Sequence, residues 1–431
     1  MQRRDFLTAG AWAAGGALLG PRLTFAGSAD GGKPRLVFVI LRGALDGLAA
    51  VPPCGDPGYV ALRGDLAIAP AGTAGGALAL DGLFGLHPSL AFMQQSYAAR
   101  ELIVFHAVAS PYRDRSHFDG QNVLETGYPQ PHAVQSGWLN RALAAIPAGR
   151  TVATERGISL APTAPLVMRG PASVTSWSPS HLAPLDDDTL QRVADLYSRD
   201  ALLKQKLAEA LAAEAIVGED SAGAAPPMAG SGGQGGDDGN VGDGGMSRRP
   251  LLARRGKPGA RYAEVVKAAA RFLRQENGPL VAVFDTTGWD THFNEGGARG
   301  QLAARLAVLD SALRALKTGL GPVWSDTAVL LATEFGRTVA ENGTRGTDHG
   351  TATAAYLLGG AVNGGRVIAD WPGLSPRKLY QDRDLAPTLD LRSVLKGLLA
   401  DHLAVPARAL ESTVFPESRQ ARPLTGLLRA S

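Results

Sequence analysis

Four short runs of apolar residues stand out in the hydrophobic pattern of the chain. They cover residues 36–41, 102–108, 280–284 and 327–332. The first contains β-branched and aromatic residues, which favour strands, and the other three are similar. Strands that are apolar throughout are buried on both faces, which is usual in parallel sheets. The runs therefore predict a mainly parallel sheet that is covered on both sides.

Between these runs the apolar positions take a helical spacing. The clearest stripe consists of leucines at alternating steps of four and three and ends at Gly321. Its members are Leu302, Leu306, Leu309, Leu313, Leu316 and Leu320. Three aspartates at 186–188 predict the cap of another long helix that runs to about Ala215. Strand, helix and strand in this order predict an α/β fold with right-handed crossovers.

A change of composition interrupts this pattern. From about 218 to 259 the chain consists largely of Gly, Ala, Asp, Pro and Ser. Such a segment cannot bury enough apolar surface to offset the entropy lost on ordering. We therefore expect one α/β domain over residues 27–431, interrupted by a disordered Gly-rich insertion.

The N-terminus has the order of a twin-arginine export signal. Arg3 and Arg4 precede a short apolar run that ends at Gly20, and Ala26 and Ala29 are candidate cleavage positions. A retained anchor helix is the alternative, although the run is too short to span a bilayer comfortably. We expect a signal over residues 1–26, recognised by the twin-arginine export machinery. The processed protein is expected to be periplasmic or secreted, with no stable membrane span.

The net charge argues against a nucleic-acid-binding protein, and the cysteine content excludes a protein stabilised by internal disulfides. The formal net charge is +3, and removal of the expected signal lowers it to about +1, so the sequence predicts no nucleic-acid partner. Cys54 is the single cysteine, which excludes an internal disulfide even in an oxidising compartment.

Acidic residues and histidines gather after the predicted strands and before a further apolar stretch. Asp46, Asp290, His292 and Glu334 follow strands, and Asp348 and His349 precede the stretch AAYLLGG. The carboxyl ends of parallel strands build the functional site, and burying an unpaired carboxylate costs several kcal/mol, so these groups predict a site. Oxygen and nitrogen donors suit one or two divalent metals, with zinc, manganese, calcium and magnesium left open.

Each of these residues also has a structural interpretation. Asp46 is a candidate helix cap, Asp290 is able to order the turn after Trp289, and Glu334 is able to pair with Arg337. The interpretation as a site rests on the whole set.

Two serines follow the second apolar run. A hydroxyl at the start of a helix, such as Ser116 beside Arg113 or Arg115, suits a metal-activated nucleophile that attacks a tetrahedral anion. Ser110 is the other candidate nucleophile. The structural alternative for Ser116 is a simple N-cap.

The order of several motifs resembles one family. FVILRGALDGL, SPYRDRSHF, GWDTH, TEFGRT, DHG and LLGGAVNGGRVIADWPGL are similar to the exported bacterial family called domain of unknown function fifteen-oh-one. That family is grouped with alkaline phosphatases and sulfatases. The resemblance implies a three-layer α/β/α sandwich with a large mainly parallel sheet and metal ligands at the strand ends. It matches Asp46 to the first-strand metal ligand, Asp290 and His292 to an Asp-plus-His pair, and His349 to a late histidine.

The chain also departs from that superfamily. Glu334 is followed by Phe335 where the phosphatases carry an Asp-His pair, so one imidazole ligand is missing. The nearest match to the sulfatase nucleophile motif puts Ala109 at the reactive position, whereas counting back from the following TG pair reaches His117 beside Ser116. Formylglycine chemistry is therefore not expected, and Ser116 is preferred over Ser110.

Two functions follow from these residues. The first is an exported metal-dependent hydrolase of phosphate or sulfate esters, acting on a small-molecule or polymer substrate. The six acidic and histidine residues would bind metal, Ser116 would be the nucleophile, and Arg113, Arg115 or Arg337 would stabilise charge. The second is an exported, non-catalytic binding or assembly protein that retains the fold.

Overall fold

The computed structural model describes residues 33–147, 156–179, 200–218 and 258–430, together with residues 193, 196 and 197. Within these ranges, Lys33–Arg429 forms one compact unit. The expected export signal, residues 186–188 and nearly all of the Gly-rich segment lie outside the described residues. No described helix has the length and apolar character needed to cross a membrane.

A nine-stranded sheet forms the centre of this unit. Its strands are β1 (Arg35–Arg42), β4 (Leu102–Ala109), β5 (Gly157–Ser159), β6 (Val174–Ser176), β7 (Val281–Thr287), β8 (Thr327–Ala332), β9 (Thr353–Leu358), β10 (Arg366–Ile368) and β11 (Leu389–Asp390). The order is β10-β4-β9-β8-β1-β7-β5-β6, and β11 pairs with β4. All pairs are parallel except those of β9 with β4 and β8. The strands β2 (Leu78–Ala79) and β3 (Gly85–Leu86) form a separate hairpin.

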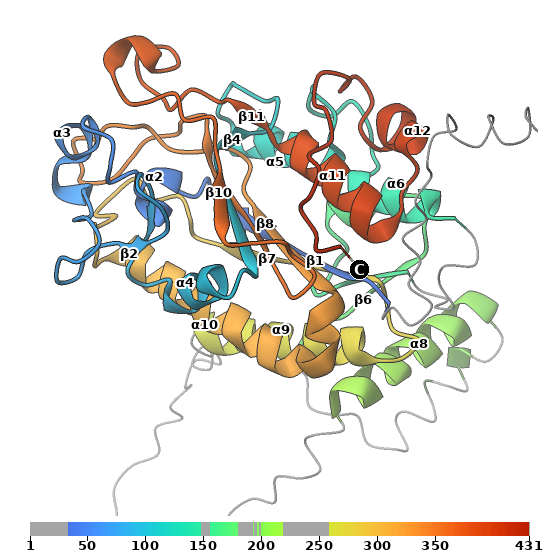
Figure 1. Cartoon of the computed structure of the whole chain (residues 1–431). Helices are drawn as coiled ribbons and strands as arrows, with labels where there is room; N and C mark the ends of the chain where they lie inside the picture. The colour runs from blue at the N-terminus through green and yellow to red at the C-terminus, as the bar shows by residue number, and fades with distance from the viewer. Residues whose placement is uncertain are drawn as a thin grey trace, which may run out of the picture. The chain divides into compact units, whose positions relative to one another are not determined.

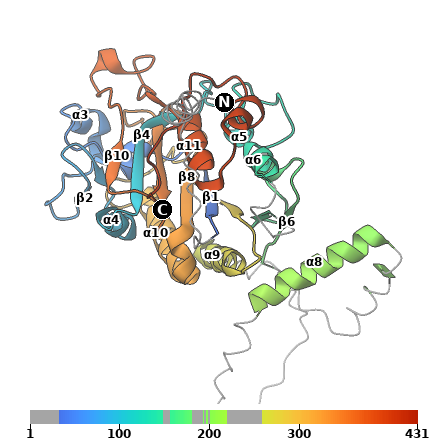
Figure 2. The same cartoon turned by 45° about the vertical axis from the view of Figure 1, so that its right-hand side comes forward.

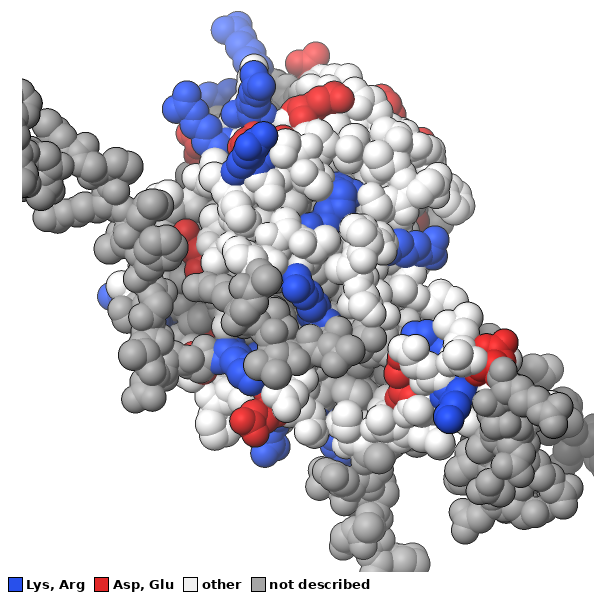
Figure 3. Space-filling view, turned by 90° about the vertical axis from the view of Figure 1, so that its right-hand side faces the viewer, with Lys and Arg blue, Asp and Glu red and all other residues white. Residues whose placement is uncertain are grey.

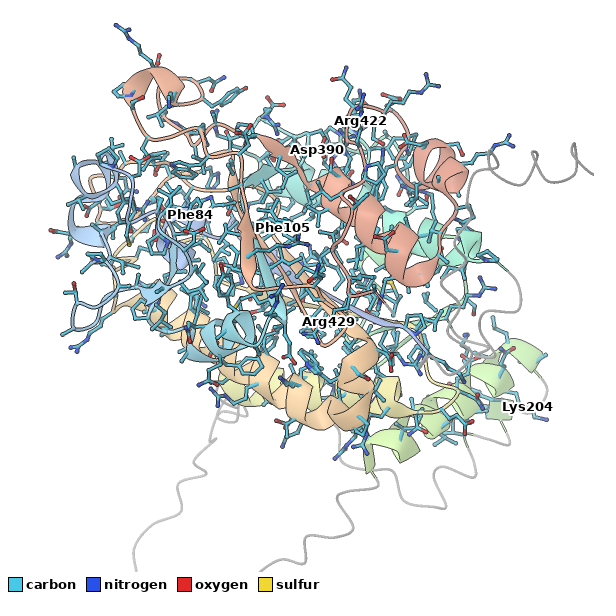
Figure 4. The ribbon with its side chains drawn as sticks, viewed as in Figure 1. Phe84, Phe105, Lys204, Asp390, Arg422 and Arg429 are labelled. Carbon is cyan, nitrogen blue, oxygen red and sulfur yellow. The ribbon has the colours of Figure 1, made fainter. Side chains whose placement is uncertain are left out.

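Both faces of the sheet are buried, as the continuous apolar runs predict. In β1, Val37 and Val39 belong to one apolar cluster, whereas Phe38 and Ile40 belong to another. Because successive side chains of a strand point to opposite faces, the two clusters are the two sides of the sheet. Phe105 of β4 shows the result, since it is fully buried in the middle of the molecule (Figure 4).

Helices cover the two faces as separate layers (Figure 1). One layer contains α4 (Ala91–Ala98), α9 (Pro258–Arg274) and α10 (Gln301–Leu320), with α8 (Ala201–Gly218) against α9. The other contains α5 (His117–Thr126), α6 (Trp138–Ala145), α11 (Leu391–Leu403) and α12 (Ala407–Ala409). A second view separates the layers clearly (Figure 2). The predicted three-layer α/β/α sandwich is confirmed.

Shorter helical segments complete the unit. They are α2 (Gly47–Ala50), α3 (Tyr59–Arg63), η2 (Gly64–Leu66), η3 (Leu166–Met168), η5 (Gly321–Asp326), η6 (Pro376–Lys378) and the π-helical η7 (Leu410–Val414). The predicted leucine stripe lies in α10, which ends at Gly321 with a positive φ of 54°. That conformation is one that glycine adopts without steric cost.

The strand β9, which runs antiparallel to its neighbours in the nine-stranded sheet of the described residues, determines which loops meet. The strands β1, β4, β7 and β8 run in one direction, so their carboxyl ends lie at the same edge of the sheet. Because β9 runs the opposite way, the loop before it, which carries His349, reaches that same edge. Four loops that are distant in sequence therefore converge there.

Charged side chains are scattered over the face seen in Figure 3. Lys and Arg stand as separate groups among uncharged atoms, with Asp and Glu between them. This distribution agrees with the small net charge of the chain. It offers no continuous basic stripe on that face of the described residues.

Candidate metal centre

Three imidazoles surround the carboxylate of Asp290 at this edge of the sheet. His292 Nε2 lies 3.1 Å and His349 Nε2 lies 3.2 Å from Asp290 Oδ1, and His117 Nε2 lies 3.4 Å from Oδ2. His117 is the first residue of α5, which follows β4, whereas Asp290 and His292 follow β7. Loops of three strands thus supply the four side chains, which we call the histidine centre.

The other nitrogen of each imidazole is bonded to an acceptor. His117 Nδ1 lies 2.8 Å from Glu334 Oε1, His292 Nδ1 lies 3.2 Å from Asp348 Oδ1, and His349 Nδ1 lies 2.9 Å from the carbonyl oxygen of Arg115. A carbonyl or carboxylate oxygen accepts, so each Nδ1 carries the proton. In the neutral imidazoles, each Nε2 therefore presents a lone pair towards Asp290.

Two of these nitrogens also approach each other. His292 Nε2 and His349 Nε2 are 3.0 Å apart, so in neutral rings with the proton on Nδ1 two lone pairs would face one another. His117 Nε2 is buried and has no hydrogen-bond partner among the described residues. A cation between these atoms removes both problems.

The donor set fits a divalent metal. One ligand atom each from His117, Asp290 and His349 lies within 4.8 Å of the other two, and His292 stands beside them. Imidazole nitrogen with carboxylate oxygen is a set that zinc and related metals accept. Hydrogen bonds from the distal imidazole nitrogens to carboxylates or carbonyls are the usual surroundings of metal-binding histidines.

Arg337 holds Asp290 from the protein side. Its guanidinium is fully buried, bonds Asp290 Oδ1 and the carbonyl oxygen of Thr347, and donates from Nε to Thr347 Oγ1 at 3.0 Å. Burial would raise the pKa of Asp290, but the hydrogen bond and charge of Arg337 lower it. The carboxylate is therefore ionised and available as a ligand, while the buried Arg337 directs three of its five N–H donors to Asp290 and Thr347.

Glu334 and Asp348 are placed around the histidines instead of facing a metal. Glu334 is fully buried, and its Oε1 also accepts from Gly43 N at 2.9 Å and Gln121 Nε2 at 3.1 Å. Burial would raise the pKa of Glu334, but its hydrogen bonds, with His117 first, lower it. In turn, the hydrogen bond to Glu334 raises the pKa of His117 despite burial. Glu334 and Asp348 therefore orient imidazoles.

Asp46 is not brought to the histidine centre. Its Oδ1 accepts from Leu48 N at 2.9 Å and Ala49 N at 3.1 Å, which makes it the N-cap of α2, and its Oδ2 pairs with Arg63. Burial would raise the pKa of Asp46, but the charge of Arg63 and the hydrogen bonds lower it. These contacts give Asp46 the role of a helix cap, which is the structural alternative to metal binding.

The predicted catalytic residues have mixed positions. Ser116 occupies the N-cap position of α5 beside His117, but its side chain makes no capping hydrogen bond. Ser110 is buried, and its hydroxyl donates to the Glu334 carbonyl at 3.3 Å. Arg113 bonds the backbone of its own loop, and Arg115 bonds Asp384 and Gln381. Neither guanidinium faces the centre, although the Arg115 carbonyl orients His349.

Sequence reasoning missed His117 as a member of the histidine centre. The available signal was its place in the segment after the predicted strand 102–108, beside the candidate nucleophile Ser116. Arg63, which pairs with Asp46, follows no apolar run, and Glu295 lies three residues after His292 but outside the GWDTH motif, so neither was singled out.

Comparison with known proteins identifies the family and a distant structural likeness. No curated protein matches the chain. The crystal structure of Ps i-CgsB in complex with k-i-k-neocarrahexaose is similar over 91% of this chain and 77% of that chain, with 9% identity and a TM-score of 0.41. Phosphonate monoester hydrolase of Agrobacterium radiobacter is similar over 86% of this chain and 74% of that chain, with 9% identity and a TM-score of 0.38.

The family predicted from the order of motifs is confirmed. The sequence matches the family described as protein of unknown function (DUF1501) over residues 96–414, which is most of the chain. The match includes the loops that carry all four side chains of the histidine centre. The chain belongs to the DUF1501 family.

Proposed function

We propose that this protein is a metal-dependent hydrolase of phosphate or sulfate esters, with the metal held by His117, Asp290 and His349 and with His292 as a further donor. The observation that carries the proposal is the convergence of three imidazole Nε2 atoms on the carboxylate of Asp290, with His292 Nε2 and His349 Nε2 only 3.0 Å apart. A divalent metal there would act as a Lewis acid and lower the pKa of a bound water molecule.

The residues of the chain fit this role in two further ways. The side chains of Asp290 and His292 are 40% and 30% exposed, so a substrate is able to reach the centre from solvent. Ser116 adjoins His117 and its hydroxyl makes no N-cap bond but lies beside Tyr112, a position from which it would act as the nucleophile. The ester class rests on the resemblance of the motifs to alkaline phosphatases and sulfatases, with a small molecule or a polymer as the substrate.

A second candidate function is a non-catalytic binding or assembly protein that retains the metal. The observation that favours it is the commitment of Arg113, Arg115 and Arg337 to other protein groups. In each of them the hydrogen bonds described above go to protein groups, which favours a structural role over charge stabilisation on a transferring group. Under both functions we propose export by the twin-arginine route.

Thermal unfolding of chelator-treated protein tests the metal. Zinc at a hundred times its dissociation constant is expected to stabilise the wild type by about 2.7 kcal/mol. His117→Ala and His349→Ala should lose most of this shift. His132→Ala is the matched control, because His132 is exposed and bonded to Asp119 outside the centre. Manganese, magnesium and calcium are compared in the same way.

An ester screen separates the two functions. If zinc stabilises the wild type and phosphate or sulfate esters are cleaved, Ser116→Ala should abolish turnover and retain the zinc shift. Equal zinc shifts in the wild type, His117→Ala and His349→Ala would refute the metal centre. A bound metal with no turnover would favour the binding protein.

A further inference from the structure

Two chain segments that carry the histidine centre run side by side. Segment 290–295 contains Asp290 and His292, and segment 344–349 contains His349. Three backbone hydrogen bonds join them: Asn294 N to Thr344 O at 3.0 Å, Glu295 N to Arg345 O at 2.9 Å and Thr347 N to Thr291 O at 3.1 Å. The relative position of the two segments therefore sets how far apart their ligand atoms lie.

One buried carboxylate fastens the side chains of both segments. Glu295 is fully buried, and its Oε2 accepts from Thr291 Oγ1 at 2.9 Å and from Thr347 Oγ1 at 2.7 Å. Each threonine lies next to site residues, since Thr291 separates Asp290 from His292 and Thr347 precedes Asp348. A single oxygen thus receives one hydroxyl from each segment.

Glu295 is also linked to the side chain of Asp290, through Thr347 and then Arg337. The Thr347 hydroxyl that donates to Glu295 accepts from Arg337 Nε at 3.0 Å, and the guanidinium of Arg337 bonds Asp290 Oδ1. Glu295 itself is anchored, because Leu302 N at the start of α10 donates to its carbonyl at 3.2 Å and Arg63 Nη2 lies 3.7 Å from its Oε1. The carboxylate therefore connects the ligand loops to the rigid body of the protein.

We propose that Glu295 is a positioning residue of the histidine centre, holding the His292 and His349 segments in register through Thr291 and Thr347. The proposal rests on the metal centre proposed above. Metal affinity depends steeply on the spacing of the ligand atoms, and loss of supporting contacts around ligands typically costs about 10- to 100-fold in affinity. Glu295 touches no ligand, so it acts only through the two threonines and Arg337.

The test uses isosteric substitutions in the full chain and zinc as the probe. Thr347→Val and Thr291→Val keep the side-chain shape and remove the hydroxyl, whereas Thr347→Ser keeps the hydroxyl. Zinc affinity is measured by competition with a chromophoric chelator, and the visible spectrum of the cobalt-substituted protein reports the ligand geometry. Each valine variant should bind zinc about tenfold more weakly with an altered cobalt spectrum, and Thr347→Ser should restore both.

Asp310→Ala is the matched control for a general loss of stability. Asp310 is also a buried carboxylate, but it accepts from Phe92 N and Met93 N, each at 2.9 Å, at the start of α4. It should lower the unfolding temperature and leave zinc affinity unchanged. Glu295→Ala is the direct variant, and the threonine pair decides the question if that protein does not fold.

The outcomes separate the two proposals. Wild-type zinc affinity in both valine variants would overturn the positioning role and leave the metal centre intact. Absence of zinc binding by the wild type would overturn both. Equal loss of affinity in Asp310→Ala would show that zinc binding follows overall stability, which also overturns the positioning role.

Discussion

The histidine centre and the cluster of Asp46, Arg63 and Glu295 are two groups of charged residues built on loops at the same edge of the sheet. In the cluster, which we call the closed cluster, the three side chains are at most 1% exposed, and Arg63 pairs with Asp46 and lies 3.7 Å from Glu295. In the histidine centre, His117 is the least exposed of the four side chains and is still 23% exposed. One group is sealed and the other reaches solvent.

The difference lies in the donors. In the closed cluster a guanidinium and two backbone N–H groups satisfy Asp46, although Glu295 Oε1 and Arg63 Nε have no hydrogen-bond partner among the described residues. In the histidine centre, three imidazole Nε2 atoms crowd around Asp290, which Arg337 compensates from the protein side. A carboxylate after a strand is thus insufficient to indicate a metal ligand, and what matters is whether its lone pairs are already used.

The largest effect is expected from Asp46→Ala in the closed cluster. Removing one partner of a buried ion pair leaves an uncompensated charge and typically costs about 3–5 kcal/mol. The free energy of unfolding, measured with urea in the absence of metal, should fall by that amount. His349→Ala, at a partly exposed position, should cost about 1 kcal/mol or less under the same conditions.

Repeating the measurement with zinc sharpens the comparison. The loss in Asp46→Ala should be the same with and without zinc, because Asp46 already has its partners. A zinc shift that disappears in Asp46→Ala would identify Asp46 as a metal ligand, as the family resemblance implies.

The fold was largely predictable because its signal is local. Continuous apolar runs marked β1, β4, β7 and β8, and the leucine stripe marked α10 to its last residue. The direction of β9 was not predictable, since a buried strand has the same pattern in either direction. That direction is what brings His349 to the site.

The site was predictable only in part, because partners are set by contacts distant in sequence. The motifs GWDTH and DHG correctly drew attention to the loops that meet, whereas the role of each side chain depended on its neighbours. Glu334 orients His117 across 217 positions of sequence, and Asp46 is neutralised by Arg63, a residue with no motif of its own. Residue type and spacing do not carry this information.

An intermediate effect is expected from His106, which lies beside the closed cluster. Its ring is fully buried, with Nε2 3.0 Å from the Val51 carbonyl and Nδ1 accepting from Ala107 N at 2.8 Å. Burial lowers the pKa of His106 to about 4, so the folded protein keeps the imidazole neutral. The unfolded chain takes up this proton near pH 6.5, roughly the unperturbed value.

The sign of the pH dependence follows from this difference. The contribution of His106 is present in full above about pH 6.5 and is lost as pH falls through about 4, roughly 3 kcal/mol in all. Urea unfolding of the metal-free protein at pH 7 and pH 4.5 should show most of this loss. His106→Gln, which does not titrate, should reduce the difference between the two pH values. An unchanged difference would assign the acid sensitivity to other groups.

The smallest effect on stability is expected at two exposed phenylalanines that adjoin the histidine centre in sequence. Phe118 and Phe293 directly follow His117 and His292, and they are 86% and 64% exposed. Because little of either ring is buried, Phe118→Ala and Phe293→Ala should change the free energy of unfolding by less than about 0.5 kcal/mol.

Rings exposed beside a site are suited to contact the non-reacting part of a substrate, and an aromatic contact is worth about 0.5–1.5 kcal/mol. For an aryl ester that the wild type cleaves, we therefore expect KM to rise about two- to tenfold with kcat retained. An alkyl ester of the same acid should show a smaller change, and Val308→Ala, at an exposed apolar position on α10, is the control. Equal kinetics for the aryl ester in the wild type and both phenylalanine variants would remove these rings from substrate binding and leave the metal ligands as the whole of the site.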